Sequence, residues 1–462
     1  MRLGARAPLA AELAAFAAIV GAHVYMLTRT LHARTFFDEG VYLLSLDGLR
    51  HGEALGRDVF ASQMPGFYVL LQGVGAVFGV SIAGVRSGMV AVAAIGALLA
   101  YLAGRRVGGP LTGLACAGIV VIAPRLSTLG SRIYADLPAM VLALASLWAA
   151  TWRRTLPAGA LIAAACLVKV SALTALPALA GLLLLEGGRR RRLLEAALGA
   201  AAVVAVTALV FVRDLGSLWT DAVIYHLRGR SQLNQVSPRH EIAAFFDPHT
   251  PFCWLVIAGL AAATVQGRRL WPWLLWPIAA CGFMLEYTPL RENESLVLPY
   301  ALAVPAGLGL GLAAARLPRQ ALVVATVLAA AVLAAGWVQQ LHLVQSNLVQ
   351  GEDPTLVHAA AVLDTVTKPG DVVISDQPIV AFLADRPVPG NYVDTASLRW
   401  NTHTLSDAEV LRDAGDVAAV VAGRAFYNRP QLMSGLASQF RYEDKLPGAD
   451  IFYGRKPLGS AG

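Results

Sequence analysis

Two adjacent carboxylates, Asp38 and Glu39, stand in the segment RTFFDEGVYLL (residues 34–44) of a strongly apolar chain. A carboxylate can take a proton from a hydroxyl group, ligate a metal ion, or cap the N-terminus of a helix. The residues that follow, GVYLLSLDGL, favour a helix. The pair therefore has two interpretations: it belongs to a reactive site, or it is a solvated pair that caps this helix and offsets its macrodipole.

Two further ionisable residues lie next to apolar runs. Asp136 precedes Leu137-Pro138 and either caps a helix or contributes to a site, and Lys169 stands in CLVKVSALTALP. Because an ammonium group is costly in an apolar environment, Lys169 either reaches the membrane interface or has an anionic partner. The sequence favours an anionic partner for Lys169.

Basic residues form a third group of candidates. Each has a simpler explanation: a basic patch facing lipid headgroups, a structural histidine, or an arginine paired with neighbouring glutamates. Carboxylates combined with several fixed cations nevertheless suit a substrate whose phosphate lies at headgroup level and whose lipid tail lies between helices. The basic candidates are Arg132 in SRIYAD, His226, Arg228 and Arg230 in YHLRGR, and Arg291 in PLRENES.

Composition excludes a soluble globule. Of 462 residues, 56% are hydrophobic and 15% are charged, and the mean hydropathy is +0.58. The net charge of +7 comes largely from arginine clusters that flank apolar runs, where the positive-inside rule explains them, so nucleic-acid binding is not expected. The four cysteines lie in apolar runs without metal or disulfide spacing. The sequence predicts an integral membrane protein.

The arginine clusters also predict a topology. The run from Leu9 to Leu27 reads as an uncleaved first span with the N-terminus in the cytoplasm. Residues 64–82 could be a second span or an interfacial helix; only the interfacial interpretation puts every later arginine cluster inside. It gives about eleven transmembrane helices in a multi-pass cell-membrane protein, with Asp38 and Glu39 outside.

The region after residue 338 has a different composition. Three short apolar segments bounded by polar residues predict buried strands: DVVISD (371–376), VAAVVAG (417–423) and DIFYGR (450–455). Helix-start signals lie between them, namely Asp353-Pro354 and the capping box from Ser406 to Glu409. We therefore expect two domains. Residues 1–338 form a transmembrane domain with outer-loop interfacial helices in 29–85, and residues 339–462 form a small α/β extracytoplasmic domain that is structural or positions an acceptor.

Several of these segments, in this order, resemble a known superfamily. FDEGVY, GLRHGEALGRDVFASQMPGFYVLLQGVGAVFG and SRIYADLPAMVLALAS are similar to the opening of the GT-C polytopic glycosyltransferases, the branch with protein mannosyltransferases and aminoarabinose lipid A transferases. The similarity covers roughly the first 190 residues, and more loosely LRENESLVLPYALAVPAGLGL. It implies an α-helical, GT-C-like membrane fold and a polyprenyl-phosphate sugar donor.

The resemblance also implies roles. Asp38 would be the general base, and Glu39 or Asp136 would orient the acceptor or a divalent metal ion, whose requirement stays open. The enzyme would transfer a hexosyl or pentosyl group, with inversion, to an extracytoplasmic lipid, glycan or protein hydroxyl. The residues expected to bind the donor phosphate are Lys169, Arg132, His226, Arg228 and Arg291.

Two rival functions come from other classes. A transporter or flippase of a lipid-linked or anionic solute would place charges near the membrane midplane and show inverted repeats. The sequence has no convincing repeat, and its polar candidates gather at one predicted face. A membrane-anchored binding or assembly protein, with the outer domain as its working part, is the other alternative.

Overall fold

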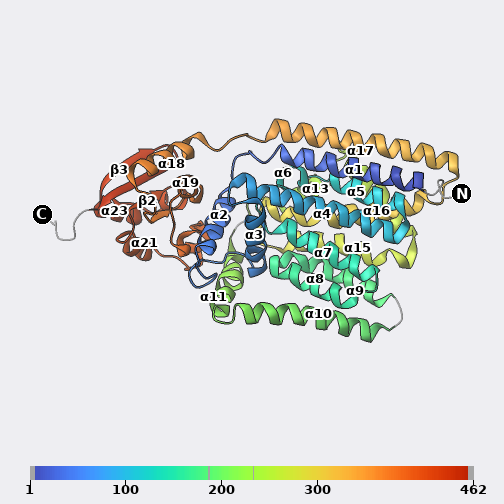
Figure 1. The fold of residues 1–462 in the computed structure, drawn as a ribbon, viewed down its shortest axis with the longest axis horizontal. Coiled ribbons are helices and arrows are strands. Elements are labelled where there is room, and N and C mark those ends of the chain that lie inside the picture. Colours follow the sequence, from blue (N-terminus) through green and yellow to red (C-terminus); the bar gives the residue numbers. More distant parts are fainter. Residues whose placement is uncertain (1–5, 186–187, 233, 456–462) are drawn as a thin grey trace. The chain divides into compact units, whose positions relative to one another are not determined.

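The computed structural model describes residues 6–185, 188–232 and 234–455. Within these residues the chain packs as two compact units, whose elements are labelled in Figure 1. The helical unit contains residues 6–31, 86–210 and 234–348, and the α/β unit contains residues 32–85, 211–232 and 349–455. These units are defined by packing and do not show which parts of the chain are independent domains. The predicted boundary between two domains after residue 338 therefore stays a prediction.

The helical unit is a bundle of apolar helices joined mostly by short loops. Its principal elements are α1 (Arg6–Thr28), α4 (Ile82–Gly108), α5 (Pro110–Val121), α6 (Leu126–Leu129), α7 (Asp136–Thr151), α8 (Thr155–Val168), the 3-10 helix η1 (Val170–Ala175), α9 (Leu176–Leu184), α10 (Arg189–Val210), α13 (Pro238–Ala244), α14 (Pro251–Val265), α15 (Trp271–Glu286), the 3-10 helix η5 (Glu292–Val297), α16 (Leu298–Ala314) and α17 (Arg319–Asn347).

Length and composition identify five membrane-spanning candidates among the described residues. They are Leu9–Thr28, Ile82–Gly108, Arg189–Val210, Glu292–Ala314 and Arg319–Asn347. The other predicted spans overlap shorter helices of the bundle, so the exact number of membrane crossings stays a prediction. Helix α3 (Pro65–Phe78) is a separate short apolar helix within the segment predicted to lie at the interface.

Glycines allow the helices of the bundle to approach closely. A Cβ at Gly159 of α8 would overlap the carbonyl oxygen of Ala196 on α10. On α16, a Cβ at Gly307 would overlap the backbone of Cys116 on α5. Small residues at such crossings are typical of membrane helices, because dispersion contacts then replace the hydrophobic effect as the main attraction.

Helix α17 is packed more loosely, along the outside of the bundle in Figure 1. Its buried residues, Gly336, Gln340 and Val344, all lie in its second half. An apolar cavity of about 770 Å³ lies between α17 and helices α1, α5 and α16. Alanine, leucine, isoleucine and valine side chains make up most of its lining, so the cavity suits a hydrocarbon chain.

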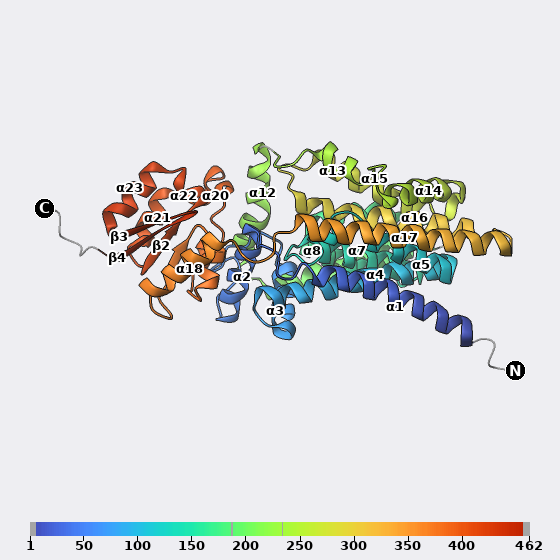
Figure 2. The same cartoon turned by 90° about the horizontal axis from the view of Figure 1, so that it is seen from above.

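The α/β unit is built on a four-stranded mixed sheet in the order β1-β2-β4-β3. Strands β1 (Val373–Ser375) and β2 (Ala419–Ala422) are parallel, whereas β4 (Ala449–Arg455) runs antiparallel to both β2 and β3 (Phe440–Leu446). Figures 1 and 2 show α18 (Pro354–Val366) on one face and α21 (Asp407–Ala414) with α23 (Pro430–Gln439) on the other.

Sequence signals located most of this sheet. Two of the predicted strand segments contain β1 and β2, and the third covers all of β4 except Ala449. Both predicted caps form: the Thr355 N–H donates to Asp353 Oδ1 at 3.0 Å, and the Ser406 N–H donates to Glu409 Oε2 at 2.8 Å. Strand β3 was not predicted, because its sequence FRYEDKL is mostly charged and lies at the edge of the sheet.

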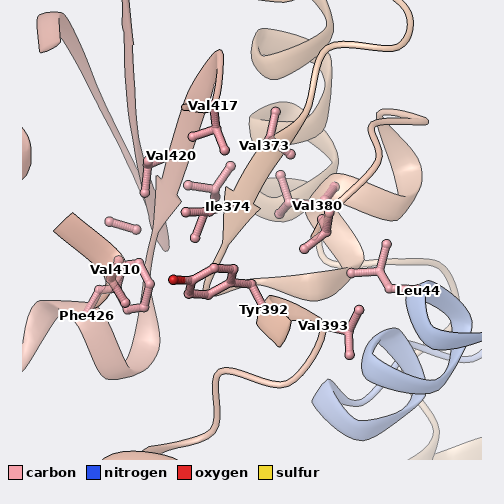
Figure 3. Close-up of a cluster of buried hydrophobic side chains, with 14 of the residues drawn as sticks. Leu44, Val373, Ile374, Val380, Tyr392, Val393, Val410, Val417, Val420 and Phe426 are labelled. Atoms are coloured by element: carbon pink, nitrogen blue, oxygen red, sulfur yellow. The ribbon is translucent and has the colours of Figure 1, made fainter. Parts of the chain in front are cut away.

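Segments from the first half of the chain complete the core of the α/β unit. Leu44 of α2 (Phe37–Arg50), Tyr68 of α3 and Leu218 of α11 (Leu215–Trp219) are buried in the same hydrophobic cluster as Ile374 and Val420 of the sheet. Figure 3 shows Leu44 beside the side chains of this core. The helix that begins with Phe37-Asp38-Glu39 is therefore fixed by the C-terminal sheet.

Candidate functional site

The two carboxylates at the start of α2 lie in different environments. Glu39 is fully buried, and its Oε2 accepts a hydrogen bond from the Phe36 N–H at 3.1 Å, which is half of a capping box. Asp38 is partly buried in the same first turn. Because consecutive helix residues point about 100° apart, the two side chains leave the helix in different directions. Glu39 thus has the capping role that the sequence offered as an alternative.

The C-terminal region anchors the approach to α2. The Arg34 guanidinium forms an ion pair with Asp353 at 3.2 Å, and the Thr35 N–H donates to Glu352 Oε2 at 3.0 Å. One turn into α2, a Cβ at Gly40 would lie 2.9 Å from the Ile379 backbone nitrogen. Glycine therefore lets α2 pack directly on α19 (Pro378–Leu383), and this packing sets the position of the first turn.

In the helical unit, three helix ends bring a lysine together with two carboxylates. Lys169 lies where α8 ends and η1 begins; its Nζ is 2.6 Å from Asp136 Oδ2 at the start of α7 and 3.2 Å from Glu294 Oε1 in η5. Asn293 Nδ2 donates to Asp136 Oδ2 at 3.0 Å. All four side chains are buried. The anionic partner expected for Lys169 is thus present.

This cluster is electrostatically incomplete. Lys169 contributes one positive charge against the two carboxylates, which leaves one net negative charge when all three are ionised. The second oxygen of Asp136, Oδ1, is buried and accepts no hydrogen bond from the described residues. The Lys169 ammonium is therefore already engaged by two anions, and a phosphate would have to compete with them for it.

The other basic candidates divide between the two units. In the helical unit, Arg132 is 2% exposed, and the Arg291 N–H donates to Glu294 Oε2 at 2.8 Å. In the α/β unit, His226 Nε2 lies 2.8 Å from the Ser62 carbonyl oxygen, and Arg228 is exposed at the end of α12 (Tyr225–Arg228). The structure thus brings Asp136, Lys169 and the backbone of Arg291 together, whereas Asp38, Glu39, His226 and Arg228 lie in the other unit.

Sequence reasoning missed Arg125. This arginine has φ = 66° and holds Glu241 by two hydrogen bonds, Nη2 to Oε1 at 2.8 Å and Nε to Oε2 at 3.1 Å; it also forms an ion pair with Glu292. It missed Glu294 and Asn293 as partners of Lys169 too. The only signal is the acidic character of RENES, and the sequence leaves pairing of these glutamates with Arg291 as an alternative to phosphate binding by Arg291.

Comparison with solved structures gives a match over nearly the whole chain. ArnT from Cupriavidus metallidurans bound to undecaprenyl phosphate superposes with a TM-score of 0.71 at 15% identity, over 95% of this chain and 97% of that one. The Archaeoglobus fulgidus oligosaccharyltransferase in its apo form gives 0.58 at 14% identity, over 89% and 69%. Both are GT-C membrane glycosyltransferases. The chain has the GT-C fold.

At this level of identity the match establishes the fold alone. No family model and no curated protein matches the sequence. The GT-C fold and the long apolar helices together identify an integral membrane protein, and the small C-terminal sheet predicted from sequence is present. The resemblance inferred from FDEGVY and SRIYAD is confirmed for the fold.

A divalent metal ion would need several ligating side chains close together. The Archaeoglobus fulgidus oligosaccharyltransferase has also been solved in complex with Zn and sulfate, at a TM-score of 0.53 and 13% identity. In the part of this chain that the structure describes, no three histidine, cysteine, aspartate or glutamate side chains are grouped so that they could hold a metal ion.

Burial is the main influence on two carboxyls of the α/β unit. Burial raises the pKa of Asp376, at the end of β1, to about 7, although the Phe426 N–H donates to its Oδ2 at 2.9 Å. Burial likewise raises the pKa of Asp221 to about 6; its Oδ2 accepts from the Ala61 N–H at 3.2 Å. Both carboxyls support the backbone of neighbouring segments.

Proposed function

We propose that this protein is a GT-C glycosyltransferase that moves a sugar from a polyprenyl-phosphate donor to an extracytoplasmic hydroxyl acceptor. The observation that carries the proposal is the fold match with ArnT, which was solved bound to undecaprenyl phosphate. The match covers almost the whole length of both chains. A related oligosaccharyltransferase structure contains dolichol phosphate and an inhibitory peptide. Lipid phosphates thus recur in proteins of this fold.

Asp38 is the proposed general base. Glu39 is already committed to capping α2, whereas Asp38 lies partly exposed in the same turn. In the proposed step the acceptor hydroxyl loses its proton to the Asp38 carboxylate while its oxygen forms a bond to the anomeric carbon. The bond from that carbon to the phosphate oxygen breaks, and its electron pair stays on the departing polyprenyl phosphate. A single displacement of this kind inverts the anomeric centre.

Cations are needed because negative charge accumulates on the phosphate as the bond breaks. Arg132, His226, Arg228 and Arg291 are the proposed sources, together with Lys169 if it exchanges a carboxylate for the phosphate. We propose that Asp136 and Lys169 shape the site as a fixed pair. The apolar cavity beside α17 supports binding of a hydrocarbon tail, since its lining is almost wholly aliphatic.

The test is sugar transfer by the purified protein in nanodiscs, supplied with a panel of radiolabelled polyprenyl-phosphate sugars and hydroxyl acceptors. Asp38→Asn keeps the size of the side chain and removes the base, so transfer should fall by about 100-fold or more. Asp47→Asn is the matched control, because Asp47 lies further along the same helix with a 40% exposed side chain. It should transfer normally.

Two results would contradict the proposal. Normal turnover by Asp38→Asn would show that Asp38 is not the general base and is only a structural residue of the first turn of α2. Movement of the intact labelled lipid across a vesicle membrane, without release of its sugar, would instead identify a flippase.

A further inference from the structure

An arginine of the C-terminal region contacts the first turn of α2. Arg424 begins α22 (Arg424–Tyr427), directly after β2 and Gly423, and its guanidinium carbon lies 4.5 Å from the centroid of the Phe37 ring. A guanidinium at this distance from an aromatic face makes a cation–π contact. Phe37 is the residue immediately before Asp38, and the contact lies within the α/β unit.

Arg424 has no ion-pair partner among the described residues, although its charge acts to lower the pKa of the buried Asp376 carboxyl against the larger effect of burial. The Arg424 side chain is exposed, and in the part of the chain that the structure describes it donates no side-chain hydrogen bond. Two neighbouring arginines of the same unit are engaged: Arg429 pairs with Asp407 at 2.9 Å, and the buried Arg399 donates to the carbonyl oxygens of Asp394 and Thr404. Arg424 thus keeps its hydrogen-bond donors for another group.

Both ends of this contact are held in place. At the α22 end, the Phe426 N–H donates to the buried Asp376 carboxylate at 2.9 Å, and the Tyr427 N–H donates to the Gly423 carbonyl oxygen at 2.9 Å. At the α2 end, Gly40 packs on the backbone of Ile379. The backbone on both sides of the contact is therefore fixed, and the contact with the Phe37 ring is what orients the exposed guanidinium.

We propose that Arg424 is a substrate-binding residue that holds a phosphate oxyanion beside Asp38. This inference rests on the proposed function, in which Asp38 is the base. The planar guanidinium matches phosphate geometry with two parallel hydrogen bonds, and its contact with Phe37 fixes its plane before substrate arrives. Phe37 and Asp38 are consecutive residues of α2, with Cα atoms about 3.8 Å apart, so Arg424 contacts the same helical turn that carries the proposed base.

The phosphate has two sources that share this chemistry. It can be the phosphate of the polyprenyl-phosphate sugar, whose negative charge grows as the glycosidic bond breaks, or a phosphate carried by the acceptor. In the first case Arg424 stabilises the leaving group. In the second it orients the acceptor hydroxyl toward Asp38. In both cases the C-terminal region, which the sequence suggested was structural or acceptor-positioning, contributes a side chain to the reaction.

The experiment compares the wild type with Arg424→Ala, Arg424→Lys and the control Arg441→Ala. Arg441 is an exposed arginine on β3 of the same unit and forms no ion pair among the described residues. Affinity for undecaprenyl phosphate is measured in nanodiscs without turnover, and KM for donor and for acceptor is measured during transfer. Thermal unfolding of each variant shows that it is folded.

Because Arg424→Ala removes a charged hydrogen bond, it should weaken the binding of one of the two substrates by about 10- to 100-fold. Weaker binding of undecaprenyl phosphate with a raised donor KM identifies the donor phosphate. A raised KM only for a phosphorylated acceptor identifies the acceptor. Arg424→Lys should restore part of the loss, because it keeps the charge and loses the planar fork. Arg441→Ala should match the wild type.

The inference fails if Arg424→Ala keeps wild-type lipid-phosphate affinity and both wild-type KM values, or if Arg441→Ala loses as much. Those results leave the proposed function intact, provided that wild type transfers sugar and Asp38→Asn does not. Absence of transfer by wild type with every donor would instead overturn the proposed function itself.

Discussion

A buried ammonium between two carboxylates is stabilised by their opposite charge and in turn stabilises them. Lys169 lies within 3.2 Å of both Asp136 and Glu294, and all three side chains are buried. Removing the lysine leaves two uncompensated carboxylates in an apolar environment, which costs about 3–5 kcal/mol. Removing every charge together is far less costly, because no buried ion remains. This asymmetry separates a positioning role for Lys169 from direct contact with the donor phosphate.

Lys169→Met should therefore destabilise the protein, lowering its free energy of unfolding by about 3–5 kcal/mol. The triple variant Asp136→Asn, Lys169→Met, Glu294→Gln should recover most of that loss. Unfolding is followed in nanodiscs, alongside affinity for undecaprenyl phosphate. A stable Lys169→Met protein that binds this lipid at least about tenfold more weakly would instead make the ammonium a direct phosphate ligand.

At the scale of elements, helix α2 links the candidate base to the C-terminal sheet. Its first turn carries Asp38, and its apolar face, including Leu44, is buried in the core of the α/β unit. Only the missing side chain of Gly40 permits the close approach to Ile379. A small displacement of this helix would move Asp38 with little loss of core, and misplacement of a reacting group by about 1 Å can cost about 100-fold in rate.

Gly40→Ala should accordingly lower sugar transfer by about 10- to 100-fold while the protein remains folded. The control is Gly73→Ala in α3, where a new Cβ meets nothing within 4 Å. Alanine there should preserve transfer and slightly raise stability, since it favours the helical conformation. Steady-state transfer and thermal unfolding measure both effects. Wild-type kinetics for Gly40→Ala would show that α2 tolerates the shift and that its contact with α19 does not set the position of Asp38.

At the scale of the whole molecule, the features that could be predicted from the sequence are those that depend on local residue patterns, such as strands and motifs. Buried apolar runs located β1, β2 and β4, and the order of the FDEGVY and SRIYAD motifs indicated the GT-C fold. Pairings distant in sequence were not readable: nothing local in RENES shows that Glu294 meets Lys169, 125 residues away. Nor does local pattern show that Leu44 and Leu218 share a core with the C-terminal sheet. Such contacts follow from the packing of the entire chain.

The predicted topology is also a property of the whole chain, because it comes from the arginine clusters taken together. Cysteines introduced at His51 and Arg441, exposed residues of the α/β unit, should react with a membrane-impermeant maleimide applied to intact cells. A cysteine at Arg190, in the cluster that begins α10, should react only after permeabilisation, since such clusters are retained in the cytoplasm. Replacing the partly buried Cys166 and Cys281 with alanine removes background labelling, and permeabilised cells show that all three sites can react. Labelling at position 190 from outside would invert the predicted topology and place Asp38 on the cytoplasmic side, away from the proposed extracytoplasmic acceptor.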